Sequence, residues 1–261
     1  MKKNVIIVGY PKSGTNWITR LVAELLCCPI EGNWGFDDPR QTTIESIDRI
    51  SEFACFKSHH SLKEINNASE KSIYKIIYVV RDPRDVIVSG SKFFNFAYAK
   101  TDFLMKKKFY GKHLHQNLKR ISRLIMSSKY KTERMMKAVL KGDIEVDQWC
   151  KDSWAEHVRK YVNNKTFIIR YEDMLDEPFV SCDKILKYIG KDLGREEMLL
   201  AIENQSIENR RARLNRHSSP IEKKLLRKGK SKVWRGELNS KQISKVNSAL
   251  TKELMAFGYE V

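Results

Sequence analysis

A short apolar run leads straight into a glycine-containing loop and then into a helical pattern, and this succession most constrains the fold. Val5–Val8 is a β-branched run typical of a strand buried on both faces of a sheet. The loop Gly9–Gly14 follows at once, and Thr15–Leu26 carries apolar residues at helical spacing. The start of a helix after a buried strand presents free backbone N–H groups and a positive dipole end, so the loop predicts an anion site.

The rest of the chain repeats the alternation of strand and helix. Further strands are predicted at Ala54–Phe56, Ile73–Val80 and Thr166–Arg170. Helices are predicted at Asp85–Phe94, 103–141, Trp149–Val162, Val180–Gly190, 195–204 and 240–257. This order favours an α/β fold with a central parallel sheet flanked by helices. We expect one domain over residues 1–261, with a basic helical insertion at about 95–145.

The formal net charge of +17 over 261 residues calls for an anionic partner. Two segments hold the excess: 100–141 has 13 Lys and Arg against two acidic residues, and 210–235 has 11 against one. Solvated helix faces are the ordinary explanation of such runs. Charge alone therefore leaves a nucleic acid, a membrane surface and a phosphorylated small molecule open.

Cysteine usage and hydropathy indicate a cytoplasmic protein. The five cysteines are an odd number without a C-x-x-C pair, which suggests neither a disulfide framework nor a zinc knuckle and fits reduced thiols. The apolar run near the start is too short for a signal peptide, and no run reaches the length of a membrane span.

The first loop resembles a P-loop, but its lysine stands at a different position. Gly9 and Gly14 keep the glycine spacing of G-x-x-x-x-G-K-[ST], but Thr15 stands at the lysine position and Lys12 lies inside the loop. An ordinary tight turn is the alternative. The octapeptide Tyr10–Trp17 resembles the 5′-phosphosulfate loop of the cytosolic sulfotransferases, which use 3′-phosphoadenosine 5′-phosphosulfate (PAPS) as sulfuryl donor.

Further segments resemble motifs of the same family in the expected order. Tyr78–Ser89 resembles its 3′-phosphate segment, Phe56–His59 its Lys-Thr-His, and Ile169–Met174 its adenine-contacting segment. Arg227–Gly229 resembles the loop that closes over the nucleotide, although the family's second Gly and its Asp are missing after it. Ser153–Val158 resembles a helix near the acceptor pocket, where a structural histidine is expected.

The resemblance implies a sulfotransferase that moves a sulfuryl group from PAPS to a hydroxyl or amine of a small-molecule acceptor and releases PAP. It implies His59 as general base, Lys12 as the cation on the leaving phosphate and Lys57 as the group that holds the sulfuryl oxygens. No metal is expected, because lysine and arginine supply the positive charge. The implied donor-binding residues are Lys12, Ser13, Gly14, Thr15, Asn16, Trp17, Arg81, Ser89, Tyr171, Arg227, Lys228 and Gly229.

Other functions stay open on the sequence: a P-loop-type nucleotide kinase, a non-enzymatic binder of nucleic acid or anionic polymer, and an inactive PAPS-binding relative. We expect neither a nucleic-acid partner nor a membrane span, and either a monomer or a homodimer, since the family's dimer motif is not recognisable. Aromatic residues that either line an acceptor pocket or belong to the core are Trp34, Phe36, Phe93, Phe94, Phe96, Tyr98 and Phe103.

Overall fold

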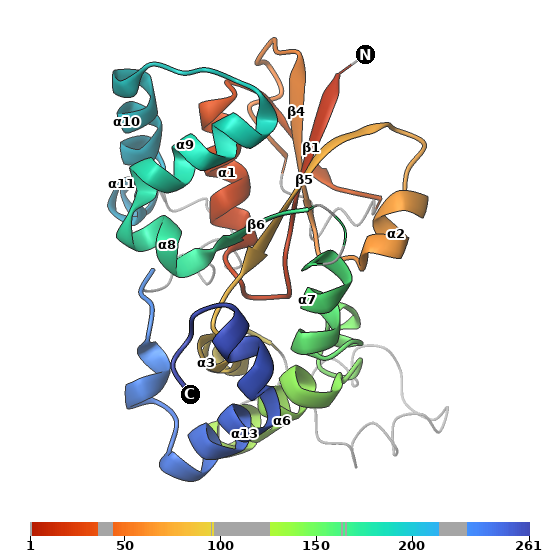
Figure 1. Ribbon diagram of the computed structural model, residues 1–261, viewed down its shortest axis with the longest axis vertical. Coiled ribbons are helices and arrows are strands. Elements are labelled where there is room, and N and C mark those ends of the chain that lie inside the picture. Colours follow the sequence, from red (N-terminus) through yellow and green to blue (C-terminus); the bar gives the residue numbers. More distant parts are fainter. Residues whose placement is uncertain are drawn as a thin grey trace, which may run out of the picture.

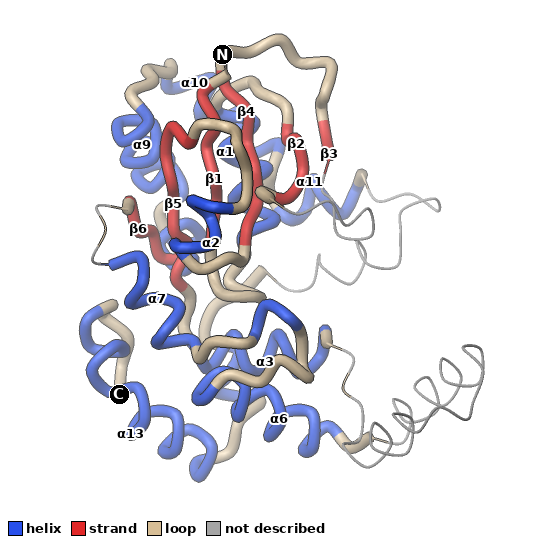
Figure 2. The backbone as a smooth tube through the Cα atoms, turned by 90° about the vertical axis from the view of Figure 1, so that its right-hand side faces the viewer, coloured by secondary structure: helices blue, strands red, loops and turns tan. Residues whose placement is uncertain are grey.

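A six-stranded sheet forms the centre of the computed structural model. The structure describes residues 2–35, 44–94, 96, 126–162, 164, 166–213 and 229–261. The sheet order is β3-β2-β4-β1-β5-β6, and Figure 2 shows these strands side by side. The strands are β1 Lys3–Val8, β2 Ile30–Asn33, β3 Ile44–Glu45, β4 Phe53–Ser58, β5 Ile73–Val80 and β6 Phe167–Arg170.

The sheet is parallel from β2 to β6, and the short β3 is antiparallel to β2. The register places Val8 of β1 opposite Ser58 of β4 and Tyr78 of β5, so the carboxyl ends of these strands meet at one edge. β4 and β5 lie on opposite sides of β1, so the connection between them crosses β1 and the direction of strand addition reverses at β1. Open α/β sheets bind ligands at such a switch point. The predicted α/β class with a mostly parallel sheet is confirmed.

Helices cover both faces of the sheet. The described helices are α1 Thr15–Leu25, α2 Leu62–Asn67, α3 Pro83–Phe93, α6 Ser128–Lys141, α7 Trp154–Val162, α8 Tyr171–Asp176, α9 Pro178–Ile189, α10 Arg195–Asn204, α11 Ile207–Ala212 and α13 Ser240–Ala256, with 3-10 turns η1 Gln148–Cys150 and η2 Val233–Gly236. Val5 and Ile7 of β1 share a core with α1, α9 and α10, whereas Ile6 and Val8 share one with α3, α6, α7 and α13. Figure 1 shows α3, α6 and α13 together beyond the end of the sheet opposite the N-terminus.

Most elements lie where the sequence pattern predicted them, and β5 has the predicted bounds. The helix predicted from Trp149 begins later, at Trp154, because Ser153 caps it. The Ser153 N–H donates to Glu156 Oε2 at 2.9 Å, and the Glu156 N–H donates to Ser153 Oγ at 3.2 Å. Trp149 lies instead in η1, a separate turn.

The predicted basic helix over 103–141 is described only at its end, as α6; residues 97–125 lie outside the described residues. α6 is amphipathic: Met135 and Val139 are buried in the core that α3 shares, while its exposed lysines are Lys129, Lys137 and Lys141. The basic insertion as a whole stays a prediction.

All five cysteines are free thiols, and four of them are buried. Burial raises the pKa of Cys150 to about 12, so this thiol stays protonated at neutral pH and is a poor nucleophile. Within the ranges that the structure describes, no helix has the length and apolar character needed to cross a bilayer.

Candidate active site

The loop between β1 and α1 presents the start of α1 at the carboxyl edge of the sheet. Gly14 is the N-cap of α1 with a φ of 91° and has no side chain to cap the helix. The Ser13 N–H donates to Tyr10 O at 3.1 Å and closes the turn. Among the described residues, the buried Ser13 hydroxyl has no hydrogen-bond partner. An uncapped helix start beside an unpartnered hydroxyl fits the phosphate site predicted for residues Ser13 to Asn16.

The two predicted adenine contacts stand together beside this loop. A Cβ on Gly14 would lie 2.4 Å from Tyr171 Cδ2, so the position requires glycine for space as well as for its φ. The Tyr171 and Trp17 rings meet edge to face, with centroids 5.7 Å apart. The Trp17 indole N–H donates to Gln205 O at 2.9 Å, which fixes the ring. The structure thus brings both predicted stacking residues to the start of α1.

Arg81, at the carboxyl end of β5, joins the phosphate loop to the C-terminal segment. Its guanidinium donates to Lys12 O at 3.1 Å and to Lys230 O at 3.3 Å, and it stacks over Tyr171 at 4.3 Å from the ring centroid. Asp85 lies 3.8 Å away, which leaves a loose ion pair. Among the described residues, the buried Arg81 Nε has no hydrogen-bond partner. A donor held without an acceptor suits a bound phosphate.

The rest of the predicted 3′-phosphate site is described in part. Ser89 is half-buried on α3. Gly229 has a φ of 53°, and a Cβ there would overlap Ile207 of α11 at 1.4 Å, so this turn also requires glycine. The predicted contacts of Arg227 and Lys228 lie outside the described residues.

The segment after Gly229 is fixed to α3 by Trp234. The Trp234 N–H donates to Asp85 Oδ1 at 3.0 Å. The guanidinium of the buried Arg84 stacks over the Trp234 ring, 4.0 Å from its centroid. Trp234 therefore holds the segment after Gly229 against the helix that follows Arg81.

His59, directly after β4, is hydrogen-bonded to the phosphate loop. Its Nδ1 lies 2.7 Å from Gly9 O. Because a carbonyl oxygen only accepts, the Nδ1 carries the proton and Nε2 keeps its lone pair. Burial lowers the pKa of His59 well below its ordinary value, and the positive charge of Lys57 lowers it further. At neutral pH the ring is therefore uncharged, with Nε2 able to accept a proton.

Two lysines and one carboxylate surround His59. Burial lowers the pKa of Lys57 to about 8, and the charge of Arg20 acts in the same direction. Asp147 opposes both effects, and burial raises its own pKa while Lys57 and Lys12 lower it. The Lys12 ammonium lies 3.4 Å from the centroid of the Phe93 ring. The structure thus joins the three predicted catalytic side chains in one electrostatic cluster, together with Asp147, which the sequence did not single out.

A hollow opens beside His59. Its lining residues are Asn33, Trp34, Lys57, Ser58, His59, His60 and Trp149. Trp149 packs on both histidines, with ring centroids 6.1 Å from His59 and 4.8 Å from His60. Sequence reasoning missed Trp149, which no spacing marks, because it reaches the site only through the packing of η1.

Of the aromatic residues that were expected either to line an acceptor pocket or to belong to the core, some lie near His59 and others lie in the core. Trp34 lines the hollow, but it is 1% exposed and its indole N–H donates to Ile65 O at 2.9 Å. Phe93 faces Lys12, whereas Phe96 is buried in the main core. The candidates outside the described residues are Phe36, Tyr98 and Phe103.

Comparison with known proteins identifies relatives over most of the chain. The family described as sulfotransferase domain matches residues 28–258, a range that begins after the phosphate loop. Sulfotransferase 2A6 of Mus musculus is 25% identical over 275 residues, covering 98% of this chain and 85% of the relative. Sulfotransferase 2A1 of Homo sapiens is 26% identical over 263 residues, covering 92% of this chain and 80% of the relative.

Solved structures share the fold. Mouse sulfotransferase SULT7A1 complexed with PAP matches with a TM-score of 0.68 and 19% identity, over 98% of this chain and 85% of that one. Retinol dehydratase in complex with androsterone and inactive cofactor PAP matches with a TM-score of 0.56 and 16% identity, over 96% and 80% of the two chains.

Proposed function

The chain belongs to the sulfotransferase family, and on that premise we propose that it transfers a sulfuryl group from PAPS to a hydroxyl or amine of a small-molecule acceptor. The hydrogen bond of 2.7 Å from His59 Nδ1 to Gly9 O carries the proposal. It fixes the base candidate to the first residue of the loop that suits the donor phosphate. Proton acceptor and donor site are therefore held at one place.

The donor fits the residues that surround this loop. The N–H groups at the start of α1 and the Ser13 hydroxyl suit its 5′-phosphate. Arg81, whose Nε has no partner within the described part of the chain, and Ser89 suit the 3′-phosphate that distinguishes PAPS from plain adenylates. Trp17 and Tyr171 suit the adenine ring. When bound, PAPS supplies the sulfuryl group and leaves as PAP.

Three side chains of this protein have separate roles in the proposed reaction. His59 Nε2 takes the proton from the acceptor hydroxyl or amine, since Nδ1 is committed to Gly9 O. The Lys12 ammonium stabilises the charge that develops on the leaving phosphate. Lys57 holds the sulfuryl oxygens while charged. A cytoplasmic location and a state of monomer or homodimer belong to the same proposal.

A direct transfer assay tests the function. We expect the protein to move radiolabel from ³⁵S-labelled PAPS to at least one class in a panel of phenols, aliphatic alcohols, amines and glycans, and to do so in the presence of a chelator. In a parallel assay, Mg²⁺-dependent transfer of ³²P from γ-labelled ATP without any transfer of ³⁵S would favour the kinase. Binding of RNA or DNA with steep salt dependence and without PAPS consumption would favour the nucleic-acid binder.

The pH dependence tests the role of Lys57. Its pKa is lowered to about 8, so the side chain loses its charge as the pH rises through that value. We expect kcat/KM for PAPS, which reports the free enzyme, to fall about tenfold for each pH unit above about 8. The Lys57→Arg variant should lose this fall, because a guanidinium stays charged there. A flat wild-type profile between about pH 7 and 10, or the same fall in both proteins, contradicts the role.

A further inference from the structure

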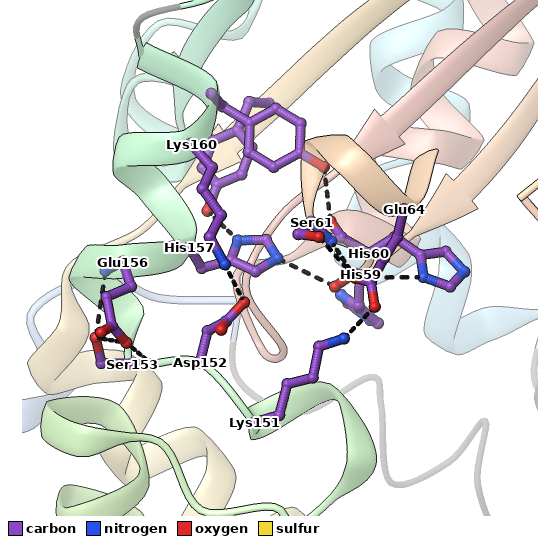
Figure 3. Close-up of polar contacts among 12 residues, drawn as sticks. His59, His60, Ser61, Glu64, Lys151, Asp152, Ser153, Glu156, His157 and Lys160 are labelled. Atoms are coloured by element: carbon purple, nitrogen blue, oxygen red, sulfur yellow. Dashed lines mark hydrogen bonds and ion pairs between the residues drawn. The ribbon is translucent and has the colours of Figure 1, made fainter. Parts of the chain in front are cut away.

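A buried histidine of α7, His157, holds the backbone that carries His59. It is 2% exposed, and both of its ring nitrogens are within hydrogen-bond distance of other groups. Nδ1 lies 2.8 Å from the Tyr78 hydroxyl, and Nε2 lies 3.0 Å from the carbonyl oxygen of His59. Figure 3 shows the His157 ring beside the His59 segment, with a dashed line joining the two.

The partners fix the direction of every hydrogen bond. The His59 carbonyl only accepts, so His157 Nε2 carries the ring proton and Nδ1 accepts from the Tyr78 hydroxyl. Burial lowers the pKa of His157 to about 4, which keeps this single protonation state at neutral pH.

These bonds form a hydrogen-bonded chain that ends at the phosphate loop. The Tyr78 hydroxyl donates to His157, and His157 donates to the His59 carbonyl. The His59 ring donates in turn to Gly9 O in the phosphate loop. The chain thus holds the backbone of His59 against α7 and its ring against the phosphate loop.

A second residue of α7 supports the same segment. The Tyr161 hydroxyl donates to His60 O at 2.6 Å, and its ring packs on that of Tyr78 with centroids 4.6 Å apart. Asp152 and Lys160 shift the pKa of His157 in opposite directions, and their side chains pair with each other at 2.7 Å. The hydrogen-bonded chain itself consists of neutral groups.

We propose that His157 is a positioning residue for sulfuryl transfer: its Nε2–H holds the His59 carbonyl so that the His59 ring keeps its proton on Nδ1 and its lone pair directed at the acceptor. The proposal rests on the proposed function of His59. A purely structural residue would contribute to stability alone, whereas His157 also sets the orientation and tautomer of the base. Misplacing a catalytic group by about 1 Å can cost about 10²-fold in rate.

Two substitutions of His157 separate its two hydrogen bonds. In His157→Asn the side-chain oxygen can still accept from Tyr78, but no donor reaches the His59 carbonyl. In His157→Gln the amide N–H₂ reaches the position of Nε2 and can donate to that carbonyl. We expect kcat to fall about 10²-fold in the Asn variant, with the Kd for PAP unchanged within about threefold, and the Gln variant to recover about tenfold of the loss.

Nitrogen-15 NMR of the His59 ring gives a readout that does not depend on turnover. We expect the wild type to show the tautomer protonated on Nδ1 and the Asn variant to show a mixture, whether or not His59 is the base. A pure Nδ1 tautomer in the Asn variant, equal kcat in the Asn and Gln variants, or a kcat in the Asn variant within twofold of wild type overturns the proposal. If the Asn variant does not fold, Tyr78→Phe, which leaves His157 Nδ1 without its donor, replaces it: a mixed His59 tautomer supports the hydrogen-bonded chain, and a pure one overturns the proposal.

Discussion

Replacing His59 by alanine should lower kcat for sulfuryl transfer by about 10²- to 10⁴-fold, the usual contribution of a positioned general base. The lost atom is Nε2, whose lone pair is available because Nδ1 donates to Gly9 O. The Kd for PAP, measured by calorimetry, should stay within about threefold of wild type, because the start of α1 and Arg81 are untouched. A kcat within tenfold of wild type contradicts the assignment.

The adjacent histidine is the matched control for this substitution. His60 follows His59 directly, but its ring packs on Trp149 and lies 3.8 Å from Glu64 rather than on the phosphate loop. We expect His60→Ala to lower kcat by less than tenfold, since its ring does not contact the phosphate loop in the part of the chain that the structure describes. A larger loss of kcat in His60→Ala than in His59→Ala would exchange the two roles.

Local patterns were sufficient to predict the framework of the fold. β1, the loop and α1 follow from a buried apolar run, two glycines and a helical apolar period, and all three lie where expected. β2 was missed, because Ile30–Asn33 contains Gly32 and Asn33 and becomes a strand only by pairing with β4. α2 was also missed, although the capping box of Ser61 and Glu64 marks its start in the sequence.

The site was predictable where its residues belong to local motifs. Gly14, Arg81 and His59 follow strands and Lys57 lies near the end of β4, and the carboxyl edge of a parallel sheet brings strand ends together. Asp147 and Trp149 reach the same edge from η1, about 90 residues after His59. Their place depends on the packing of a turn without periodicity, so no local signal indicated it.

Two parts of the sequence interpretation change in detail with the structure. His157 was expected to be structural, and its hydrogen bonds show that the backbone of His59 is what it holds in place.

The basic excess over 100–141 is described only in α6, where apolar residues face the core and the exposed lysines form the opposite side. That end of the segment therefore needs no anionic partner.

Replacing Lys12 by alanine should lower kcat by about 10²- to 10³-fold, the cost of removing one group that stabilises developing negative charge. Lys12 stands inside the phosphate loop with a φ of 74°, and its ammonium lies over the Phe93 ring. The charge of the leaving phosphate grows in the transition state, so kcat should fall much more than KM for PAPS rises. Steady-state kinetics with saturating acceptor measures both.

The control for Lys12 must remove the same charge without touching the loop. Lys92 on α3 meets this need, because its ammonium pairs with Glu237 and not with the phosphate loop. We expect Lys92→Ala to keep kcat within twofold of wild type. An equal loss in both variants would show that the overall positive field drives the reaction, whereas a loss confined to Lys12→Ala places the effect at the bond that breaks. Lys12→Arg should recover part of the rate, since it restores a charge but with a broader, planar group.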